Sequence, residues 1–257
     1  MIDIHSHILY GVDDGAKTVQ DSLDMAKEAV DQGIQVIYAT PHHLNGQFEN
    51  SAAEVKMAVQ LLNELLSNHK IGLEVRVGQE VRINGDLLEH LDSGEILTLG
   101  DKGTYILVEL PSNDVPAYTG NLLFDLQVEG LKPIIVHPER NSEIVQKPDI
   151  LFDLVNNGAL TQVTAASVAG KFGKTLQKFS LDLIDANLTH FVASDAHNIS
   201  TRAFWMDDAF SIIEAKLGID TVYYLKENAQ ILGSNEMVIG DPPQQIKTKR
   251  KFKLFKK

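Results

Sequence analysis

Histidine and carboxylate side chains occur in short clusters along this chain, with the residue types and spacings of metal ligands. His5 and His7 are two residues apart, and Asp195 and His197 repeat this spacing late in the sequence. Residues i and i+2 of a strand point to the same face, so both members of such a pair can reach one ion. Glu80 adds an anionic oxygen that can bridge two ions. These groups predict a metal site built from imidazoles and carboxylates.

The number of candidate ligands exceeds the needs of a single ion, which takes about four to six ligands. We therefore expect two or three ions. The chain contains no cysteine, and nitrogen and oxygen ligation without sulfur favours Mn²⁺, Fe or Zn²⁺ over Ca²⁺. Closely spaced metal ions typically activate water for the hydrolysis of phosphoesters. The absence of cysteine also excludes thiol catalysis, disulfides and iron–sulfur sites.

Each cluster taken alone has an ordinary structural explanation. Glu80 or Glu109 could form a salt bridge at a strand end, and Asp195 could cap the next helix. Together these explanations are weak, because so many ionisable groups side by side need ions to offset their lost hydration. The role of His43 stays open between a substrate contact and a mere neighbour of His42. The remaining histidines are expected at surface or packing positions: His69, His90 and His190.

Seven runs of β-forming residues would position these side chains, and six of them end in His, Asp or Glu. The expected strands are Ile2–His5, Val36–Thr40, Glu74–Val77, Tyr105–Glu109, Pro133–His137, Leu160–Thr164 and His190–Ala193. Helical patterns separate them, the first opening with a capping box at Thr18 and stopping at Gly33. The others cover about 51–68, 117–129, 149–157, 174–186, 205–217 and 221–232. Such alternation predicts parallel strands whose C-terminal ends share one mouth, where barrel enzymes keep their active sites.

The composition is that of one globular domain. The chain has 257 residues, of which 44% are hydrophobic and 23% charged, and a single α/β barrel of about 250 residues has this size. The first residues lack the basic and apolar regions of a secretory signal, and we find no apolar run of about 18 residues. We therefore expect a cytoplasmic protein.

Basic residues are concentrated at the C-terminal end. Residues 247–257 carry seven Lys or Arg and no acid, so the total net charge of −12 leaves −19 on the preceding residues. So acidic a body is a poor partner for nucleic acid, and no specific nucleic-acid binding is expected. We divide the chain into a barrel at 1–240 and a basic, flexible tail at 241–257. The tail is either a solubilising end or a peripheral anchor to an anionic membrane surface.

Taken together, these residues resemble the PHP superfamily of polymerase and histidinol phosphatase domains. The resemblance rests on Asp3-Ile4-His5-Ser6-His7, Asp13-Asp14-Gly15, the Thr-Pro-His sequence ending at His42, Glu80, Glu109, His137 and Ser194-Asp195-Ala196-His197. The chain is most similar to one branch, the bacterial manganese-dependent protein-tyrosine phosphatases encoded with capsule and exopolysaccharide genes. That branch also shows His-Pro-Glu-Arg, here residues 137–140, and Ala-Ser-Asp-Ala-His-Asn, here residues 193–198. The resemblance covers about residues 1–235.

The resemblance implies a distorted TIM-like (β/α)7 barrel with a trinuclear metal site at the C-terminal ends of the strands. It implies nine ligands: His5, His7, Glu80 and Asp195 around one ion, Glu80 bridging to a second with Glu109 and His137, and His42, His197 and Asp14 around a third. We choose Asp14 over Asp13 because it directly precedes the glycine. Arg140 and Arg202 are predicted to bind the phosphoryl group, since a guanidinium fork matches phosphate.

The implied function is a Mn²⁺-dependent protein-tyrosine phosphatase that acts on a cognate bacterial tyrosine kinase and regulates capsular or exopolysaccharide synthesis. One alternative is a phosphatase for histidinol phosphate or another small phosphomonoester. Another is a nuclease module of a polymerase, which would sit in a much longer chain. A non-enzymatic module would require a lost ligand, and none is lost in this sequence.

Overall fold

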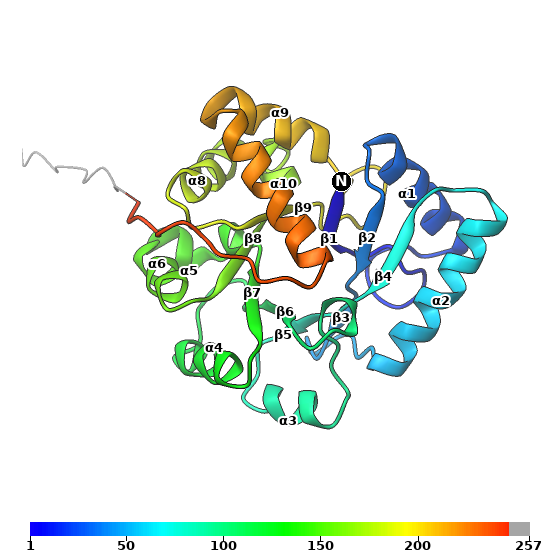
Figure 1. Cartoon of the computed structure of the whole chain (residues 1–257), viewed down its shortest axis with the longest axis horizontal. Coiled ribbons are helices and arrows are strands. Elements are labelled where there is room, and N and C mark those ends of the chain that lie inside the picture. The colour runs from blue at the N-terminus through cyan, green and yellow to red at the C-terminus, as the bar shows by residue number, and fades with distance from the viewer. Residues whose placement is uncertain (247–257) are drawn as a thin grey trace, which may run out of the picture.

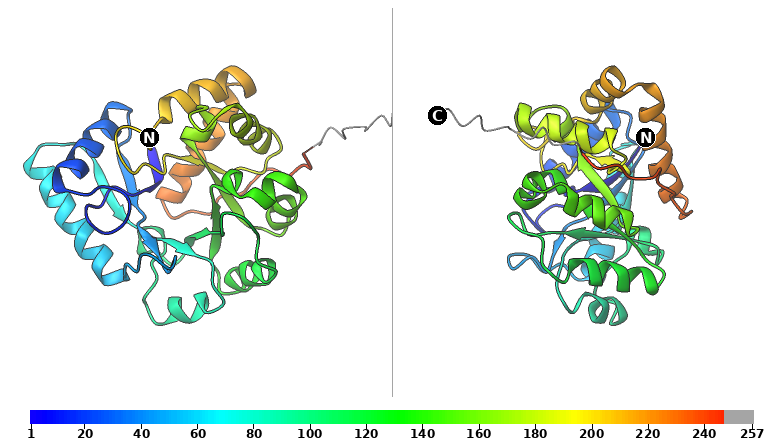
Figure 2. Two further views of the ribbon diagram at one scale, coloured as in Figure 1. Left: turned by 180° about the vertical axis from the view of Figure 1, so that it is seen from behind. Right: turned by 90° about the vertical axis from the view of Figure 1, so that its left-hand side faces the viewer.

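The strands lie parallel and are surrounded by helices, as Figures 1 and 2 show for the computed structural model, which describes residues 1–246. The strands are β1 Ile2–Ser6, β2 Val36–Ala39, β3 His42–His43, β4 Glu74–Val77, β5 Glu80–Arg82, β6 Tyr105–Glu109, β7 Lys132–Val136, β8 Leu160–Thr164 and β9 Phe191–Ala193. They pair in the orders β1-β2-β4 and β3-β5-β6-β7-β8-β9. All seven predicted strands are present.

The two sheets are parts of one distorted barrel. Strand β2 resumes as β3 after Thr40 and Pro41, and β4 resumes as β5 after Gly78 and Gln79, so nine short strands occupy seven strand positions. Proline has no backbone N–H and interrupts the hydrogen-bond ladder at the first break. Main-chain hydrogen bonds of 2.9 Å from His7 to Ala196 and from Asp195 to His5 join β1 to the end of β9. The predicted (β/α)7 barrel is confirmed, with these breaks as its distortion.

Ten α-helices in residues 1–246 connect the strands and cover their outer side. They are α1 Val19–Asp31, α2 Ala52–Asn68, α3 Leu87–Asp92, α4 Thr119–Val128, α5 Ser142–Gln146, α6 Asp149–Asn156, α7 Ala165–Val168, α8 Lys174–Asp185, α9 Met206–Leu217 and α10 Ile219–Gly233. The predicted capping box forms, since Thr18 accepts a hydrogen bond from the Asp21 amide and Asp21 accepts one from the Thr18 amide. Helices α3, α5 and α7 were not predicted, because they are too short to show a helical period.

One end of the barrel is closed by the C-terminal part of the fold. Leu232 of α10 and the following Val238 pack with Tyr105 and Leu107 of β6 in the barrel interior. The Tyr105 hydroxyl donates to the carbonyl of Glu236 and accepts from the amide of Val238. Because Tyr105 begins its strand, this cover lies over the N-terminal ends of the strands. The C-terminal ends are left to form a site.

The last described residues remain attached to the barrel body. The amide of Gln244 donates to the carbonyl of Ala186 at 2.8 Å, and the side chain of Asn187 donates to the carbonyl of Pro242 at 3.1 Å. The basic segment predicted as part of a tail, residues 247–257, lies outside the described residues. None of the helices in residues 1–246 has both the length and the apolar character that a membrane crossing requires.

Candidate metal centre

The C-terminal ends of the strands bring the nine predicted ligand residues together. Seven of them form three overlapping groups in which the candidate ligand atoms lie within 4.8 Å of one another: His7, Asp14, His42 and His197; His5, His7 and Glu80; and His42, Glu80 and Glu109. The other two border Glu80 and the first histidines. His137 Nε2 lies 2.6 Å from Glu80 Oε1, and Asp195 Oδ1 lies 3.4 Å from His7 Nε2.

Glu80 and His7 occupy the centre of this arrangement. Glu80 Oε2 lies 3.4 Å from His5 Nε2, 3.3 Å from His7 Nε2 and 2.9 Å from His42 Nδ1. Three imidazoles, two from the end of β1 and one from β3, thus converge on one carboxylate oxygen. The side chains of Glu80, His5 and His7 are all buried. A carboxylate at the junction of two groups is placed as a bridging ligand would be.

Several buried ligand atoms make no hydrogen bond within residues 1–246, although neighbouring polar atoms are close. These atoms are His42 Nδ1, Glu80 Oε2, Glu109 Oε2 and His197 Nε2. Buried polar groups are nearly always hydrogen-bonded, so a cluster of exceptions requires an explanation. Divalent cations that accept electron pairs from these nitrogens and oxygens provide one. The donor set therefore fits metal ions such as Mn²⁺, Fe²⁺ or Zn²⁺.

The electrostatic environment keeps two of the imidazoles neutral. Burial, then the nearby positive charge of Arg140, lowers the pKa of His137 to about 4. Burial, followed by the neighbouring His7, lowers the pKa of His197 to about 4 as well. A neutral imidazole keeps the lone pair that a metal ion needs. Burial and the negative charge of Glu80 raise the pKa of Glu109 to about 7, because two carboxylates so close resist ionising together.

The adjacent aspartates after β1 have different surroundings. Asp14 Oδ1 lies 3.4 Å from His42 Nε2 and 3.2 Å from His197 Nε2, within a candidate ligand group. Asp13 instead accepts from His7 Nδ1 at 2.6 Å and from the amides of Gly15 and His42 at 2.8 and 3.1 Å. The geometry therefore favours Asp14 as a ligand and gives Asp13 the role of holding His7 and its loop.

Other ligand histidines are also held at their second nitrogen. His5 Nδ1 lies 2.9 Å from Oε1 of Gln162, and His197 Nδ1 lies 2.9 Å from the carbonyl of Asp195. Such partners fix the tautomer and the ring orientation of a metal-binding histidine. Gln162 lies on β8, the one predicted strand without a ligand at its end, and was not predicted. The strand also contains Thr161 and Thr164, so Gln162 did not stand out in the sequence as a polar residue.

Arg140 and Arg202 both border a pocket of about 320 Å³ beside the metal centre, together with His42, Glu109 and His137. Arg140 Nη1 lies 2.8 Å from Asp195 Oδ2. Arg202 lies 3.1 Å from Asp14 Oδ2 through Nη1, and its Nη2 lies 3.4 Å from Asp195 Oδ1. Two guanidinium groups thus stand at the edge of the candidate ligands, where an anionic substrate group could contact both.

A buried carboxylate fixes the turn that carries His137 and Arg140. Glu139 accepts hydrogen bonds from the Thr164 amide at 3.0 Å and the Ser167 hydroxyl at 2.7 Å, which ties the end of β7 to the end of β8. His137 has a φ of 37°, in the left-handed region. Non-glycine residues in this region are strained and cluster at functional sites. Glu139 was not predicted, although it lies inside the His-Pro-Glu-Arg sequence.

The remaining histidines lie apart from the candidate ligand groups. His69 is an exposed residue that ends α2, and His90 pairs with Glu95 at 2.7 Å. His190 is buried and accepts from the Thr161 amide at 3.1 Å. His43 is buried next to His42, and its Nδ1 accepts from the Asn50 amide. The structure therefore places His43 in packing and gives it no position among the ligand groups.

Known proteins of similar sequence cover nearly the whole chain. It is 48% identical to tyrosine-protein phosphatase YwqE of Bacillus subtilis over 99% of this chain and 100% of that protein. It is 42% identical to the putative tyrosine-protein phosphatase CapC of Staphylococcus aureus, with the same coverage.

Solved structures show the same relationship. One solved structure is 48% identical in sequence and has a TM-score of 0.94, over 96% of this chain and 100% of that one. It belongs to a set of crystal structures of YwqE from Bacillus subtilis and CpsB from Streptococcus pneumoniae, which are described as metal-dependent tyrosine phosphatases. Histidinol phosphate phosphatase from Lactococcus lactis is 14% identical with a TM-score of 0.53, over 83% of this chain and 92% of that one, which is a likeness of fold alone. Residues 1–233 match the family described as capsular polysaccharide synthesis, CpsB/CapC. The chain belongs to the CpsB/CapC family of capsular polysaccharide synthesis proteins.

Proposed function

We propose that this protein is a metal-dependent protein-tyrosine phosphatase of a capsular or exopolysaccharide synthesis system. The observation that carries the proposal is the convergence of nine imidazole and carboxylate groups beside two arginines at one end of the barrel. The similar proteins YwqE, CapC and CpsB bear the name tyrosine-protein phosphatase, CapC as a putative one. Both lines of support concern the same site, since the similarity to YwqE spans all of these residues.

The proposed ligands are those of the three overlapping groups together with His137 and Asp195. The ions we propose are two or three Mn²⁺, with Fe or Zn²⁺ as substitutes, because the ligands are nitrogen and oxygen atoms. Bound divalent ions supply Lewis-acid polarisation of phosphoryl oxygens and activation of water. Catalysis through a cysteine nucleophile is excluded, because the chain has no cysteine.

The chain's own contribution is to bind and orient the phosphoryl group. Arg140 and Arg202 each present a planar guanidinium that can pair with two phosphoryl oxygens. In the structure both arginines contact Asp195, which holds them beside the metal centre. Charge developing on the phosphoryl oxygens is thereby met by groups already in place. A tyrosine phenolate has a pKa near 10, so its departure needs less help from an acid than that of an alkoxide.

Chelation and a choice of substrates test this function. The wild-type protein should hydrolyse a phosphotyrosine peptide faster than histidinol phosphate, lose activity in EDTA and recover it with Mn²⁺. Full activity in protein that elemental analysis shows to be free of metal would refute the multinuclear site. A preference for histidinol phosphate would instead retain the site and replace the substrate.

The proposed protein substrate is a tyrosine kinase of the same capsule system. Support comes from the family description, which places the chain in capsular polysaccharide synthesis. Incubating the autophosphorylated kinase with the phosphatase and measuring its phosphotyrosine over time would test this assignment. A kinase that stays phosphorylated while a phosphotyrosine peptide is hydrolysed in the same tube would contradict it.

The basic segment 247–257 is proposed to bind an anionic membrane surface at the cytoplasmic side. Support comes from its seven positive charges, which contribute about 1 kcal/mol each near such a surface. Deleting the segment should reduce co-sedimentation with phosphatidylserine vesicles and leave hydrolysis of a small aryl phosphate intact, since every proposed ligand precedes residue 203. Equal sedimentation of the two proteins at low salt would identify the segment as a solubilising end only.

A further inference from the structure

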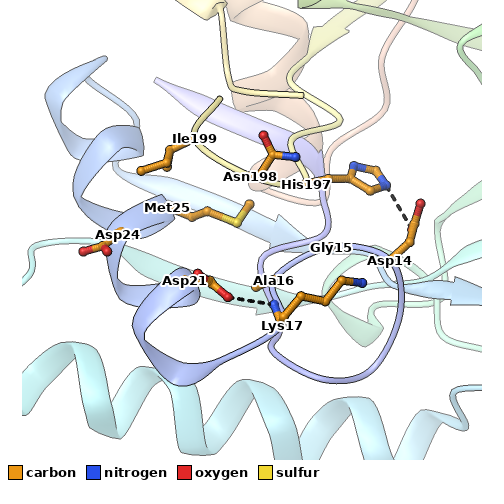
Figure 3. Close-up of a pocket in the computed structure, with 10 residues that line it drawn as sticks. All are labelled: Asp14, Gly15, Ala16, Lys17, Asp21, Asp24, Met25, His197, Asn198 and Ile199. Carbon is orange, nitrogen blue, oxygen red and sulfur yellow. Dashed lines mark hydrogen bonds and ion pairs between the residues drawn. The ribbon is translucent and has the colours of Figure 1, made fainter. Parts of the chain in front are cut away.

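The sequence Ala-Ser-Asp-Ala-His-Asn at residues 193–198 ends in an asparagine that is neither a candidate ligand nor a cationic group. Figure 3 shows Asn198 beside His197, whose ring extends toward Asp14. The loop that begins at Asn198 carries Arg202, which borders the pocket beside the metal centre. Asn198 therefore stands between a candidate ligand and an arginine that is proposed to bind the phosphoryl group.

A single oxygen atom of Asn198 organises this loop. Its Oδ1 accepts hydrogen bonds at 2.9, 2.8 and 3.1 Å from the amides of three consecutive residues, Ser200, Thr201 and Arg202. The Ser200 hydroxyl also donates to this oxygen, at 3.0 Å. Asparagine side chains that accept from main-chain amides a few residues onward take the place of a backbone turn. The three amides thus share one side-chain acceptor.

Burial fixes the two ends of the loop but not its tip. Ile199, Ser200 and Thr201 are exposed. His197 is buried at the start of the loop, and Phe204 is buried at its end. Side-chain packing therefore sets where the loop begins and ends, and the turn made by Asn198 sets the conformation between those points.

The main chain of Arg202 is held at both of its polar groups. Its amide donates to Asn198 Oδ1, and its carbonyl accepts from the amides of His197 at 2.8 Å and Asn198 at 3.2 Å. The guanidinium contacts Asp14 and Asp195, which are both proposed metal ligands. Because these carboxylates would be shared with the ions, the main chain is the anchor of Arg202 that metal binding leaves in place.

His197 has anchors that do not involve the Asn198 side chain. Its ring is buried, and its Nδ1 lies 2.9 Å from the carbonyl of Asp195. The amide of His7 in turn joins the residue before His197 to the end of β1, through a main-chain hydrogen bond of 2.9 Å. Loss of the turn at Asn198 should therefore displace Arg202 more than it displaces His197.

From these contacts we infer that Asn198 is a positioning residue, which holds Arg202 in place to bind the phosphoryl group. The inference rests on the proposed function, because that function gives Arg202 a phosphoryl group to bind. A site whose binding-competent conformation is only partly populated loses affinity by the same fraction. Removing the side-chain acceptor of such a turn should therefore weaken phosphate binding about fivefold, if the turn contributes as much as a helix N-cap does.

Phosphate binding and hydrolysis measured on the same proteins test the inference. Calorimetry gives the Kd of inorganic phosphate for the full-length, Mn²⁺-loaded protein, and kinetics give kcat/KM for 4-nitrophenyl phosphate. Asn198→Ala should weaken phosphate binding and lower kcat/KM, each about fivefold, while the Mn²⁺ concentration for half-maximal activity stays unchanged.

Two further variants at this position separate the acceptor oxygen from the rest of the side chain. Asn198→Asp keeps the acceptor and should restore most of the affinity, measured at about 0.15 M salt to screen the added charge. Asn198→Gln moves the amide by one carbon and should behave as Asn198→Ala does. It replaces Asn198→Ala should that variant fail to fold.

A double-mutant cycle assigns the effect to Arg202. Asn198→Ala should cause no further loss of phosphate binding in a protein that already carries Arg202→Ala, because the two changes remove the same interaction. The matched control is Asn63→Ala in α2, which removes hydrogen bonds of 2.7 and 3.0 Å to the main chain of Val75 on the outer side of the barrel. This control should lower the melting temperature and keep the wild-type Kd for phosphate.

Several results would overturn the inference. They are unchanged phosphate binding in Asn198→Ala, no recovery in Asn198→Asp, a full further loss in the Arg202→Ala background, a shift of the Mn²⁺ midpoint that accounts for the whole effect, and equal weakening in Asn63→Ala.

The proposed function is judged separately, by Mn²⁺-dependent hydrolysis of a phosphotyrosine peptide by the wild-type protein. Normal hydrolysis with an unchanged Kd for phosphate in Asn198→Ala would refute only the positioning role. A wild-type protein that binds phosphate without hydrolysing the peptide would refute the proposed function, and the Kd values would still decide the positioning role. A wild-type protein that binds no phosphate would refute both.

Discussion

The Asp13→Asn variant offers a sharp test of how the metal centre is held. The Asp13 carboxylate is buried and accepts three hydrogen bonds, from His7 Nδ1 and from the amides of Gly15 and His42. Two of these bonds hold residues of the candidate ligand groups. Asparagine preserves the size of the side chain but replaces one acceptor oxygen with a donor group. At least one of the three donors therefore loses its partner.

The expected loss of Mn²⁺ affinity follows from the loss of that one hydrogen bond. A hydrogen bond to a charged group contributes about 1.5–3 kcal/mol, and loss of the outer partner of a metal-binding histidine typically lowers metal affinity about 10- to 100-fold. These two ranges agree, since a tenfold change corresponds to about 1.4 kcal/mol. We expect the Mn²⁺ concentration for half-maximal activity to rise by the same 10- to 100-fold.

The assay is a Mn²⁺ titration of metal-free protein, followed by hydrolysis of a small aryl phosphate and by calorimetry of Mn²⁺ binding. Asp13→Asn should recover most of its turnover at saturating Mn²⁺. Asp14→Asn, which removes an atom from the ligand group itself, should stay impaired there. An unchanged Mn²⁺ midpoint in Asp13→Asn would refute the orienting role. Failure of Asp13→Asn to recover, in a variant with wild-type melting temperature, would make Asp13 a ligand.

Two further predictions concern residues inside and outside the site. Arg140→Ala should lower kcat/KM for an aryl phosphate by a factor that corresponds to about 2–4 kcal/mol of lost transition-state stabilisation. His69→Ala, at an exposed helix end, should leave kcat/KM unchanged. Equal loss of activity in both variants would show that His69 was wrongly assigned to the surface. Burial lowers the pKa of His190 to about 4, so the stability contributed by its neutral form is complete above pH 6.5 and is lost as the pH falls toward 4. Urea unfolding of the metal-free protein measures the free energy of unfolding at each pH. Between pH 6.5 and pH 4, the wild-type protein should lose up to about 3 kcal/mol more of this free energy than His190→Asn, which keeps an acceptor for the Thr161 amide. The same pH dependence in both proteins would contradict the prediction.

Much of the architecture could be predicted from local sequence patterns. Each of the seven predicted strands and seven predicted long helices is present, because periodic burial of apolar residues and capping residues such as Thr18 act over a few positions. Eight of the nine candidate ligand residues lie at or just after the ends of predicted strands, which a parallel barrel carries to one mouth. Asp14, and the full set as a set of ligands, were predicted only through the resemblance to the PHP superfamily. Spacing within one strand was enough to pair His5 with His7.

The tertiary structure decided the points that depend on contacts between distant segments. Sequence spacing could not separate Asp13 from Asp14, because the difference lies in which neighbour each carboxylate meets, His7 in one case and His42 with His197 in the other. Gln162 supports His5 from a strand that is distant in sequence. Such a pairing leaves no local pattern, because it is set by the order of the strands around the barrel. The sequence by itself therefore determined the chemical groups and their common end of the barrel, and the packing of strands and loops determined which groups touch.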